Sequence, residues 1–106
     1  MRFGSRVVTI EGAVVKLTDK QVERISSAIA EPRRFKILKD LRKHGEPMGC
    51  GNIVDKHGVS HATISHHLKE LETAGLIEIE RLGKFGNVIL KLDVWNAYVA
   101  RLAQLT

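Results

Sequence analysis

The chain of 106 residues has the length of one domain, and its 43% hydrophobic and 27% charged residues are typical of a globular protein. Its 17 Lys and Arg residues against 12 Asp and Glu residues give a net charge of +5, which favours a polyanion such as nucleic acid as partner. The single cysteine, Cys50, excludes an intrachain disulfide and a multi-cysteine zinc site, and no apolar run has the length of a signal peptide or a membrane span. We therefore expect a cytoplasmic protein that does not associate with membranes.

Residues 1–17 carry the weakest structural signal. They contain two short β-branched runs, 7–10 and 13–15, which are compatible with an extended arm or a loose hairpin. From residue 18 onward the pattern is continuous, without a linker or a repeat. We expect an N-terminal arm over 1–17 and a single domain over 18–106.

A first helix is predicted from about Asp19 to Ala30. Thr18 and Gln21 have the spacing of a capping box, and Leu17 and Val22 that of a hydrophobic staple. The helical period turns three residues of this helix inward, namely Val22, Ile25 and Ile29.

A second helix is predicted between Pro32, which suits a first helical turn, and Gly45, which suits a helix end. Four apolar residues are expected to face inward: Phe35, Ile37, Leu38 and Leu41. The rest of the helix is strongly basic, which we interpret mainly as a solvated face.

Two more helices follow in quick succession. The first runs from about Cys50 to His57 and ends at Gly58. The second covers 60–74, with Ser60 as its N-cap and Gly75 as its stop, and it has one apolar stripe formed by Ile64, Leu68 and Leu71. Leu76 is placed to contact Leu71 across a Schellman-type cap.

Beyond this cap the apolar period changes from 3.6 to 2 residues. Residues 77–80 and 88–92 are predicted strands, joined by a glycine-rich turn over 83–87, so they form an antiparallel hairpin. Asp93 is predicted to cap a last helix, in which 9 of the 12 residues from 94 to 105 are apolar. A domain this small cannot bury that whole helix, so a partner surface is expected there.

The predicted fold is mainly α with a small β-hairpin (α+β), in the order helix, helix, helix, helix, strand, strand, helix. Two short helices joined by a tight glycine-containing turn are typical of a helix-turn-helix, with 60–74 as the recognition helix and the hairpin as a wing. Residues 18–106 are thus predicted to be a winged helix-turn-helix domain for DNA binding and dimerisation.

Short polar side chains near the start of the recognition helix are the candidate base readers, because base edges in the major groove present a code of donors and acceptors. The DNA-binding candidates, including two basic residues of the wing, are Ser60, His61, Thr63, Ser65, His66, Arg81 and Lys84. Four of them also have a structural interpretation: Ser60 as a cap, Thr63 as a surface residue, and Arg81 and Lys84 as solvated charges. For His67, next to Leu68, the alternative is a side chain that packs and hydrogen-bonds within the domain. Protonation of His61, His66 and His67 is expected to add positive charge at this interface.

Three segments closely resemble the ArsR family of dimeric bacterial winged-helix repressors, namely AEPRRFKIL (30–38), VSHATISHHLKEL (59–71) and AGLI (74–77). The resemblance covers about residues 18–105. It implies a homodimer built on the first and last helices that blocks transcription from a dyad-symmetric operator until an inducer releases it. It also implies that positions 60–63, 65 and 66 face the operator. The residues expected at the dimer interface are Val22, Ile25, Ile29, Trp95, Tyr98, Val99 and Leu102.

The sequence departs from the metal-sensing members of this family. Their Cys-x-Cys pair would fall at Gly49 and Gly51, on either side of Cys50, and no histidine follows Asp93. We therefore expect no metal and no cofactor, and the inducer stays unidentified. Cys50 is interpreted as a small buried helix residue, with a redox-sensing thiol as the alternative.

Two other function classes remain as alternatives. One is a winged-helix module for protein association without DNA binding, in which the apolar last helix is the functional surface. The other is an enzyme that uses Cys50 or Ser65 with a histidine, but Ser65 and His66 are adjacent on a helix and diverge by about 100°. We therefore do not expect an enzyme.

Overall fold

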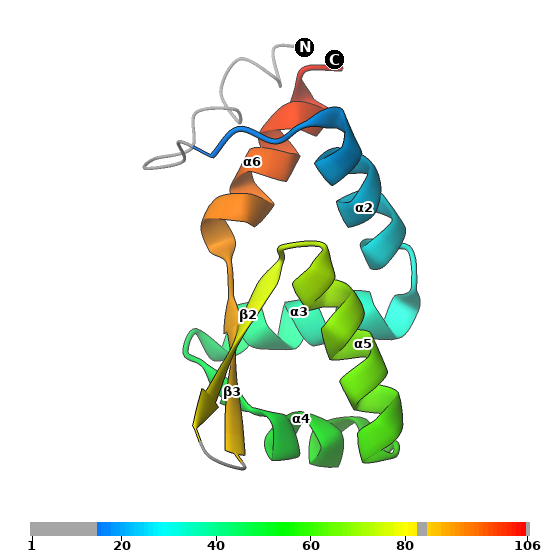
Figure 1. The fold of residues 1–106 in the computed structure, drawn as a ribbon, viewed down its shortest axis with the longest axis vertical. Helices are drawn as coiled ribbons and strands as arrows, with labels where there is room; N and C mark the ends of the chain where they lie inside the picture. Colours follow the sequence, from blue (N-terminus) through cyan, green and yellow to red (C-terminus); the bar gives the residue numbers. More distant parts are fainter. Residues whose placement is uncertain (1–14, 83–84, 106) are drawn as a thin grey trace.

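The structure, a computed structural model, describes residues 15–82 and 85–105, so most of the predicted arm over 1–17 lies outside the described residues. Within them, helices and strands follow one another as α2 (Asp19–Ile29), α3 (Pro32–His44), β1 (Met48–Gly49), α4 (Cys50–His57), α5 (His61–Thr73), β2 (Ile77–Leu82), β3 (Phe85–Leu90) and α6 (Leu92–Ala103) (Figure 1). The mainly helical prediction with a small sheet is confirmed. None of the helices in the described part of the chain has the length and apolar character of a membrane span.

The predicted start of α2 is confirmed in its hydrogen bonds. The Gln21 amide donates to Thr18 Oγ1 at 3.1 Å, and the Thr18 amide donates to Gln21 Oε1 at 2.7 Å, which completes a capping box. Of the three residues expected to face inward, Ile25 is fully buried, while Val22 and Ile29 are only partly buried. The outer part of α2 is therefore free to contact another surface.

Helix α3 has the predicted bounds, with Pro32 in its first turn and Gly45 at its end in the left-handed conformation (φ 79°). The expected inward position of Phe35 is wrong, since its side chain is 41% exposed. Ile37 and its neighbours Leu38 and Leu41 are buried. Residues two apart on a helix point about 200° away from each other, so burial of Ile37 turns Phe35 outward.

Helices α4 and α5 form the predicted helix-turn-helix, joined at Gly58. At the far end of α5, Gly75 adopts a φ of 82°, the Gly75 amide donates to the Glu72 carbonyl at 2.9 Å, and the Leu76 amide donates to the Leu71 carbonyl at 3.1 Å. These two bonds are those of a Schellman motif. They fix the direction in which the chain leaves α5 and enters β2.

The predicted hairpin is present, but its turn is shorter than expected. The β2–β3 register pairs Ile77 with Leu90 and Leu82 with Phe85, so the strand resumes at Phe85 and the predicted turn over 83–87 is too long. A third strand, β1, was not predicted. It pairs Met48 with Val88 on the other side of β3, in the order β1-β3-β2, and its two residues are too few to show a period.

The predicted cap of the last helix is wrong. Helix α6 begins at Leu92 with Lys91 at the N-cap position and no side-chain cap, and Asp93 Oδ1 instead accepts a hydrogen bond from the adjacent Val94 amide at 2.8 Å. The Lys91 amide donates to the Leu76 carbonyl at 2.9 Å. This contact between the exit of the sheet and the end of α5 sets the point at which α6 starts.

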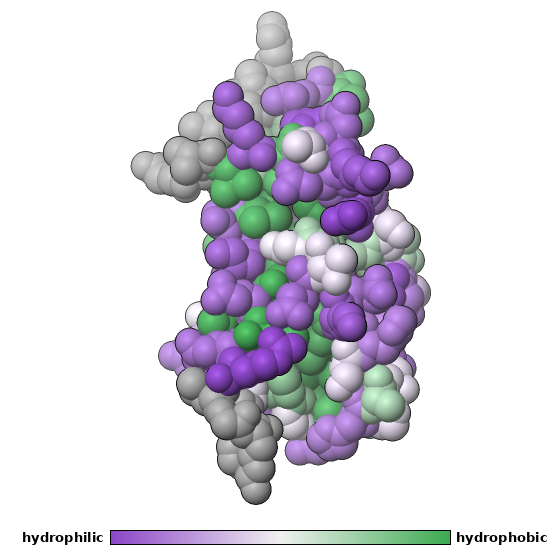
Figure 2. All heavy atoms as spheres, in the orientation of Figure 1, coloured by the Kyte–Doolittle hydropathy of each residue, from purple (hydrophilic) through white to green (hydrophobic). Residues whose placement is uncertain are grey.

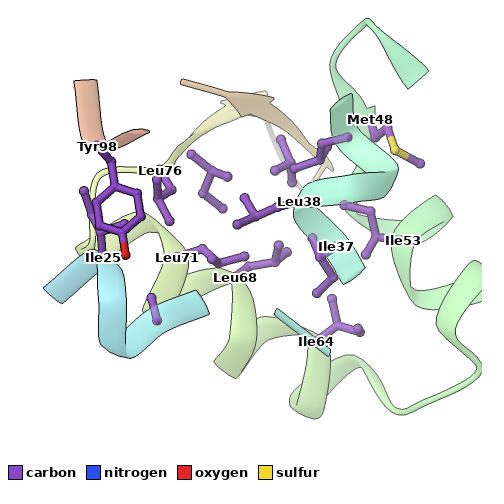
Figure 3. Close-up of a cluster of buried hydrophobic side chains, with 14 of the residues drawn as sticks. Ile25, Ile37, Leu38, Met48, Ile53, Ile64, Leu68, Leu71, Leu76 and Tyr98 are labelled. Atoms are coloured by element: carbon purple, nitrogen blue, oxygen red, sulfur yellow. The ribbon is translucent and has the colours of Figure 1, made fainter. Parts of the chain in front are cut away.

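One apolar core connects all these elements (Figure 3). Its fully buried side chains come from α2, α3, α4, α5, the α5–β2 turn and β3: Ile25, Ile37, Ile53, Ile64, Leu71, Leu76 and Val88. Helix α6 adds Tyr98, which is 4% exposed and whose hydroxyl lies 2.8 Å from Ser26 Oγ on α2. Arg101 also donates to the Leu17 carbonyl and to Asp19 Oδ1, each at 2.6 Å, so α6 is held against the start of α2.

Candidate nucleic-acid interface

The N-terminal half of α5 presents a row of exposed polar side chains. Ile64, Leu68 and Leu71 are buried and fix the inner face of the helix. The exposed side chains on its other faces, here called the polar row, are His61, Thr63, Ser65 and His66. Ala62 beside them is also exposed and adds no bulk. A surface of short donors and acceptors on a protruding helix has the chemistry that reading base edges requires.

Ser60 and Thr63 form a small hydrogen-bonded unit at the start of α5. Ser60 Oγ accepts from the Thr63 amide at 3.1 Å and donates to Thr63 Oγ1 at 2.9 Å. The structural role of Ser60 as a cap is therefore confirmed, and the hydroxyl proton of Thr63 remains free to donate outward. The first turn holds no acidic residue, so the partial positive charge of the helix N-terminus is available to a phosphate.

The three histidines of α5 occupy two different environments. His61 and His66 are exposed, but the His67 side chain is only 12% exposed and its Nδ1 lies 3.7 Å from Glu31 Oε2. Burial lowers the pKa of His67, although the nearby Glu31 carboxylate opposes this shift. The packed interpretation of His67 therefore agrees with the structure, because this side chain lies against Glu31 and burial favours its neutral form.

The wing lies at the same end of the molecule as the start of α5. In Figure 1 the turn-proximal ends of β2 and β3 and the N-terminus of α5 share one end, with α4 between them. Arg81 is exposed near the end of β2, and its guanidinium lies 3.6 Å from the Glu72 carboxylate. Lys84, the other wing candidate, lies outside the described residues.

A partly buried polar cluster that the sequence did not reveal joins α4 to α3. The His57 side chain is 1% exposed; its Nδ1 lies 3.3 Å from an Arg33 guanidinium nitrogen and its Nε2 lies 3.0 Å from Asp40 Oδ2. Because Arg33 can only donate, Nδ1 accepts and Nε2–H donates. Glu31 and Arg34 also have structural roles in this region. Glu31 caps α3 by accepting a hydrogen bond from the Arg34 amide at 2.9 Å, and Arg34 Nε donates to the Ala28 carbonyl at 2.7 Å. The segment 31–34 thus orients the helix-turn-helix.

Cys50 is half-buried at the start of α4, next to the sheet. A Cβ atom at Gly86 would lie 3.4 Å from its sulfur, so glycine makes room for the thiol. Burial raises the pKa of Cys50, with the Arg81 charge acting in the opposite direction. A thiol held in its protonated form is a poor nucleophile, which favours the packing interpretation of Cys50.

The residues expected at a dimer interface separate into two groups. Ile25 (0% exposed) and Tyr98 (4% exposed) belong to the core of the protomer and have little surface to offer a partner. The remaining five form a partly exposed apolar surface on α2 and α6, here called the α2–α6 surface: Val22, Ile29, Trp95, Val99 and Leu102. On the face drawn in Figure 2, hydrophilic and neutral side chains predominate over α5, whereas hydrophobic side chains gather over α6.

Comparison with known sequences matches this chain to regulators of transcription. A family model described as a helix-turn-helix domain matches residues 29–80. The transcriptional repressor SdpR of Bacillus subtilis (strain 168) is 41% identical over 64 residues, which are 60% of this chain and 69% of that protein. The range matched by the family model contains α3, α4 and the recognition helix α5.

Solved structures show the same fold. A crystal structure of an ArsR family transcriptional regulator superposes with a TM-score of 0.75 at 21% identity, covering 86% of this chain and 92% of that one. The homodimeric winged helix-turn-helix DNA-binding domain of Mb0332 from Mycobacterium bovis, a possible ArsR-family regulator, gives a TM-score of 0.65 at 26% identity and covers 86% of this chain and 87% of that one. These are folds and families of DNA-binding regulators rather than of enzymes. They favour the DNA-binding interpretation of α5 over a module for protein association alone.

Proposed function

Because the chain belongs to the ArsR family of winged helix-turn-helix transcriptional regulators, we propose that it is a repressor that binds a dyad-symmetric DNA operator as a homodimer. The chain is a DNA-binding regulator of transcription, as its relatives are. Repression and the homodimer are proposed in part from two of them: SdpR is named a repressor, and the Mb0332 domain is described as homodimeric. A regulator of this kind acts on DNA, so the proposed place of action is the cytoplasm.

The observation that carries the proposal is the polar row on α5. Its side chains are exposed, whereas Ile64, Leu68 and Leu71 on the inner face of the same helix are buried in the core. We infer that α5 of each protomer enters a major groove and that His61, Thr63, Ser65 and His66 contact base edges. Ser60 caps the helix and holds Thr63, and Arg81 and Lys84 of the wing contact the DNA backbone.

The proposed dimer fits this arrangement. The α2–α6 surface lies at the opposite end of the molecule from the start of α5 (Figure 1). A two-fold axis through that surface leaves both recognition helices on the outside of the dimer, where they can meet two half-sites about one helical turn apart or a small multiple of it. We propose that residues 18–106 form this DNA-binding and dimerisation domain, with residues 1–17 as an arm.

Replacing His61 or His66 by alanine is expected to relax base preference. Loss of a paired contact with a base costs about 1 to 3 kcal/mol of discrimination, a roughly 5- to 150-fold change. The operator is first selected from a random duplex pool with the unaltered protein, and the affinity of each variant for the operator and for single-base mutants is then measured by fluorescence anisotropy. His44→Ala is the matched control, because His44 is an exposed histidine at the end of α3. Unchanged discrimination in both α5 variants would contradict the assignment of the polar row to base reading.

Lowering the pH from about 8 to about 6 is expected to tighten operator binding. Protonation of a histidine that faces DNA adds a positive charge that attracts phosphates, and each proton taken up on binding adds up to about tenfold in affinity per pH unit. His67 is expected to contribute less, because its side chain lies against Glu31 and burial lowers its pKa. The measurement is the slope of the logarithm of affinity against pH; the double variant His61→Gln/His66→Gln should flatten it and His44→Gln should leave it unchanged.

The pH range of this experiment has a lower limit. A histidine whose pKa is lower in the folded than in the unfolded protein contributes stability above the unfolded pKa, and this stability is lost as the pH falls from the unfolded pKa to the folded pKa. His67 acts in this direction. Circular dichroism at each pH should therefore accompany the titration, and a flat affinity profile of the folded, unaltered protein would argue against histidines facing DNA.

A further inference from the structure

A groove with a volume of about 670 Å³ lies between α3 and the start of α6, away from the polar row of α5. Volumes of 300 to 1,000 Å³ are usual for sites that take a small organic ligand. The apolar side chains that line it are Phe35, Leu38, Leu90, Leu92 and Trp95. Phe35 is 41% and Leu92 38% exposed, so two large apolar side chains face water here in the protomer.

The charged residues of this groove are mostly of one sign. Helix α3 contributes four cations, Lys36, Lys39, Arg42 and Lys43, and one acid, Asp40. Both oxygens of Asp40 already face cations or donors: Oδ2 lies 3.0 Å from His57 Nε2 and Oδ1 lies 3.7 Å from Lys56 Nζ. Over residues 15–82 and 85–105, by contrast, none of the four cations forms an ion pair. The groove therefore combines an apolar lining with uncompensated positive charge.

The chain itself supplies no obvious occupant with complementary charge. The charged side chains of residues 1–14 are Arg2, Arg6 and Glu11, which carry a net positive charge. A second copy would bring the same basic α3 helix toward its counterpart in an isologous contact centred here, and like charges would repel each other. A ligand with an apolar body and a negative head group matches both the lining and the charge of the groove.

We propose that this groove binds a small amphipathic organic anion, and that its occupancy changes the affinity for DNA. The apolar body packs against Phe35, Leu92 and Trp95, and the carboxylate or equivalent head group lies among the α3 cations. Trp95 also belongs to the α2–α6 surface, the proposed dimer interface. A ligand that contacts the start of α6 therefore contacts the helix that sets the spacing between the two recognition helices. The binding site stands on the groove alone; the effect on DNA rests on the proposed function.

Trp95 is the only tryptophan of the chain and lines the groove, so its fluorescence reports on the groove when the titration is run at a protein concentration at which the oligomeric state stays constant. The probe is decanoate, kept below its micellar concentration, and decan-1-ol is its uncharged counterpart. We expect saturable binding of one decanoate per protomer, with a blue shift of the tryptophan emission as the alkyl chain displaces water, and at least tenfold weaker binding of the alcohol. Isothermal titration calorimetry provides a second readout of the same equilibrium.

Charge-reversal variants locate the site. Lys39→Glu combined with Lys43→Glu is expected to weaken decanoate binding at least tenfold, whereas Lys20→Glu combined with Arg24→Glu, an equal charge change on the exposed face of α2, should leave it unchanged. Binding that does not saturate, or that both double variants weaken equally, would overturn the site. A shift of the monomer–dimer equilibrium by the α3 variant with no change in decanoate affinity would overturn it too, in favour of a second copy as the occupant.

The coupling is tested separately. Decanoate at saturation is expected to change the operator affinity of the unaltered protein at least fivefold and that of the α3 double variant not at all. Saturable binding without any change in operator affinity supports the site and overturns the coupling. Absence of DNA binding by the protein without ligand would contradict the proposed function and leave the fluorescence result unaffected, so the two failures can be told apart.

Discussion

Replacing Leu102 by glutamate is expected to convert the protein to a monomer and to lower its affinity for the complete operator at least about 100-fold. Leu102 is 42% exposed on α6, within the α2–α6 surface that we propose as the dimer interface. A two-fold interface would bring two copies of the new carboxylate into an apolar contact, where an unpaired charge is costly to bury. Two linked recognition helices gain about 10²- to 10⁴-fold in avidity over one, and a monomer loses that gain. Sedimentation equilibrium and anisotropy with the operator measure both effects.

The control for this variant is Leu105→Glu, because Leu105 is 83% exposed and lies beyond the end of α6. It should remain dimeric and bind the operator normally. A duplex containing a single half-site separates dimerisation from base reading, since Leu102→Glu should bind it as the unaltered protomer does. A Leu102→Glu protein that stays dimeric and keeps full operator affinity would show that the interface lies elsewhere.

Replacing Leu71 by alanine is expected to lower the free energy of unfolding by about 2 to 5 kcal/mol, since removing a buried leucine side chain both loses its burial and leaves a cavity. Leu71 is 0% exposed, and Figure 3 shows it beside Leu68, toward Ile25 and Leu76. Its carbonyl also accepts the Leu76 amide in the Schellman motif, so the cavity would open next to the junction of α5 and the sheet. Urea unfolding followed by circular dichroism measures the change.

The unfolding experiment must be run at one fixed protein concentration, because dimerisation couples stability to concentration. Leu105→Ala, at an 83% exposed position, is the matched control and should change stability by less than about 0.5 kcal/mol. A loss below about 1 kcal/mol for Leu71→Ala would mean that the core around α5 collapses into the cavity or that this region is not the centre of the fold.

Helix boundaries were the part of the fold most accessible from the sequence. The capping box at Thr18, the cap at Ser60 and the stops at Gly45, Gly58 and Gly75 all form as expected. Each depends on groups within about four residues of one another, so the pattern contains the whole interaction. The predicted helix cap at Asp93 was wrong because a non-local hydrogen bond acts at the start of α6. Lys91 and Leu76, which form this hydrogen bond, lie far apart in the chain.

The candidate site was predictable in its main element but not in its supports. Periodicity alone separates the buried stripe of α5 from the exposed polar row, and the structure keeps that separation. It left His67 with two interpretations, and it could not reveal that Glu31 is the neighbour of His67 or that Arg33 and Asp40 hold His57. The segment 31–34 carried the resemblance to the family, but only the fold gives it a physical role: capping α3 and joining α2, α3 and α4.

The sequence by itself determined the order of the helices, the wing and the recognition helix, because caps, glycine stops and apolar periods act between neighbours along the chain. The tertiary structure decided which polar side chains meet. Ser26 hydrogen-bonds to Tyr98, Arg101 to Leu17 and Asp19, and Arg33 to His57. These partners are separated by 24 to 84 residues in the chain. It also turned Phe35 out of the core and into the lining of the groove between α3 and α6. Such contacts depend on how the helices pack over one shared core, and no local pattern encodes the distance between two elements that are remote in sequence.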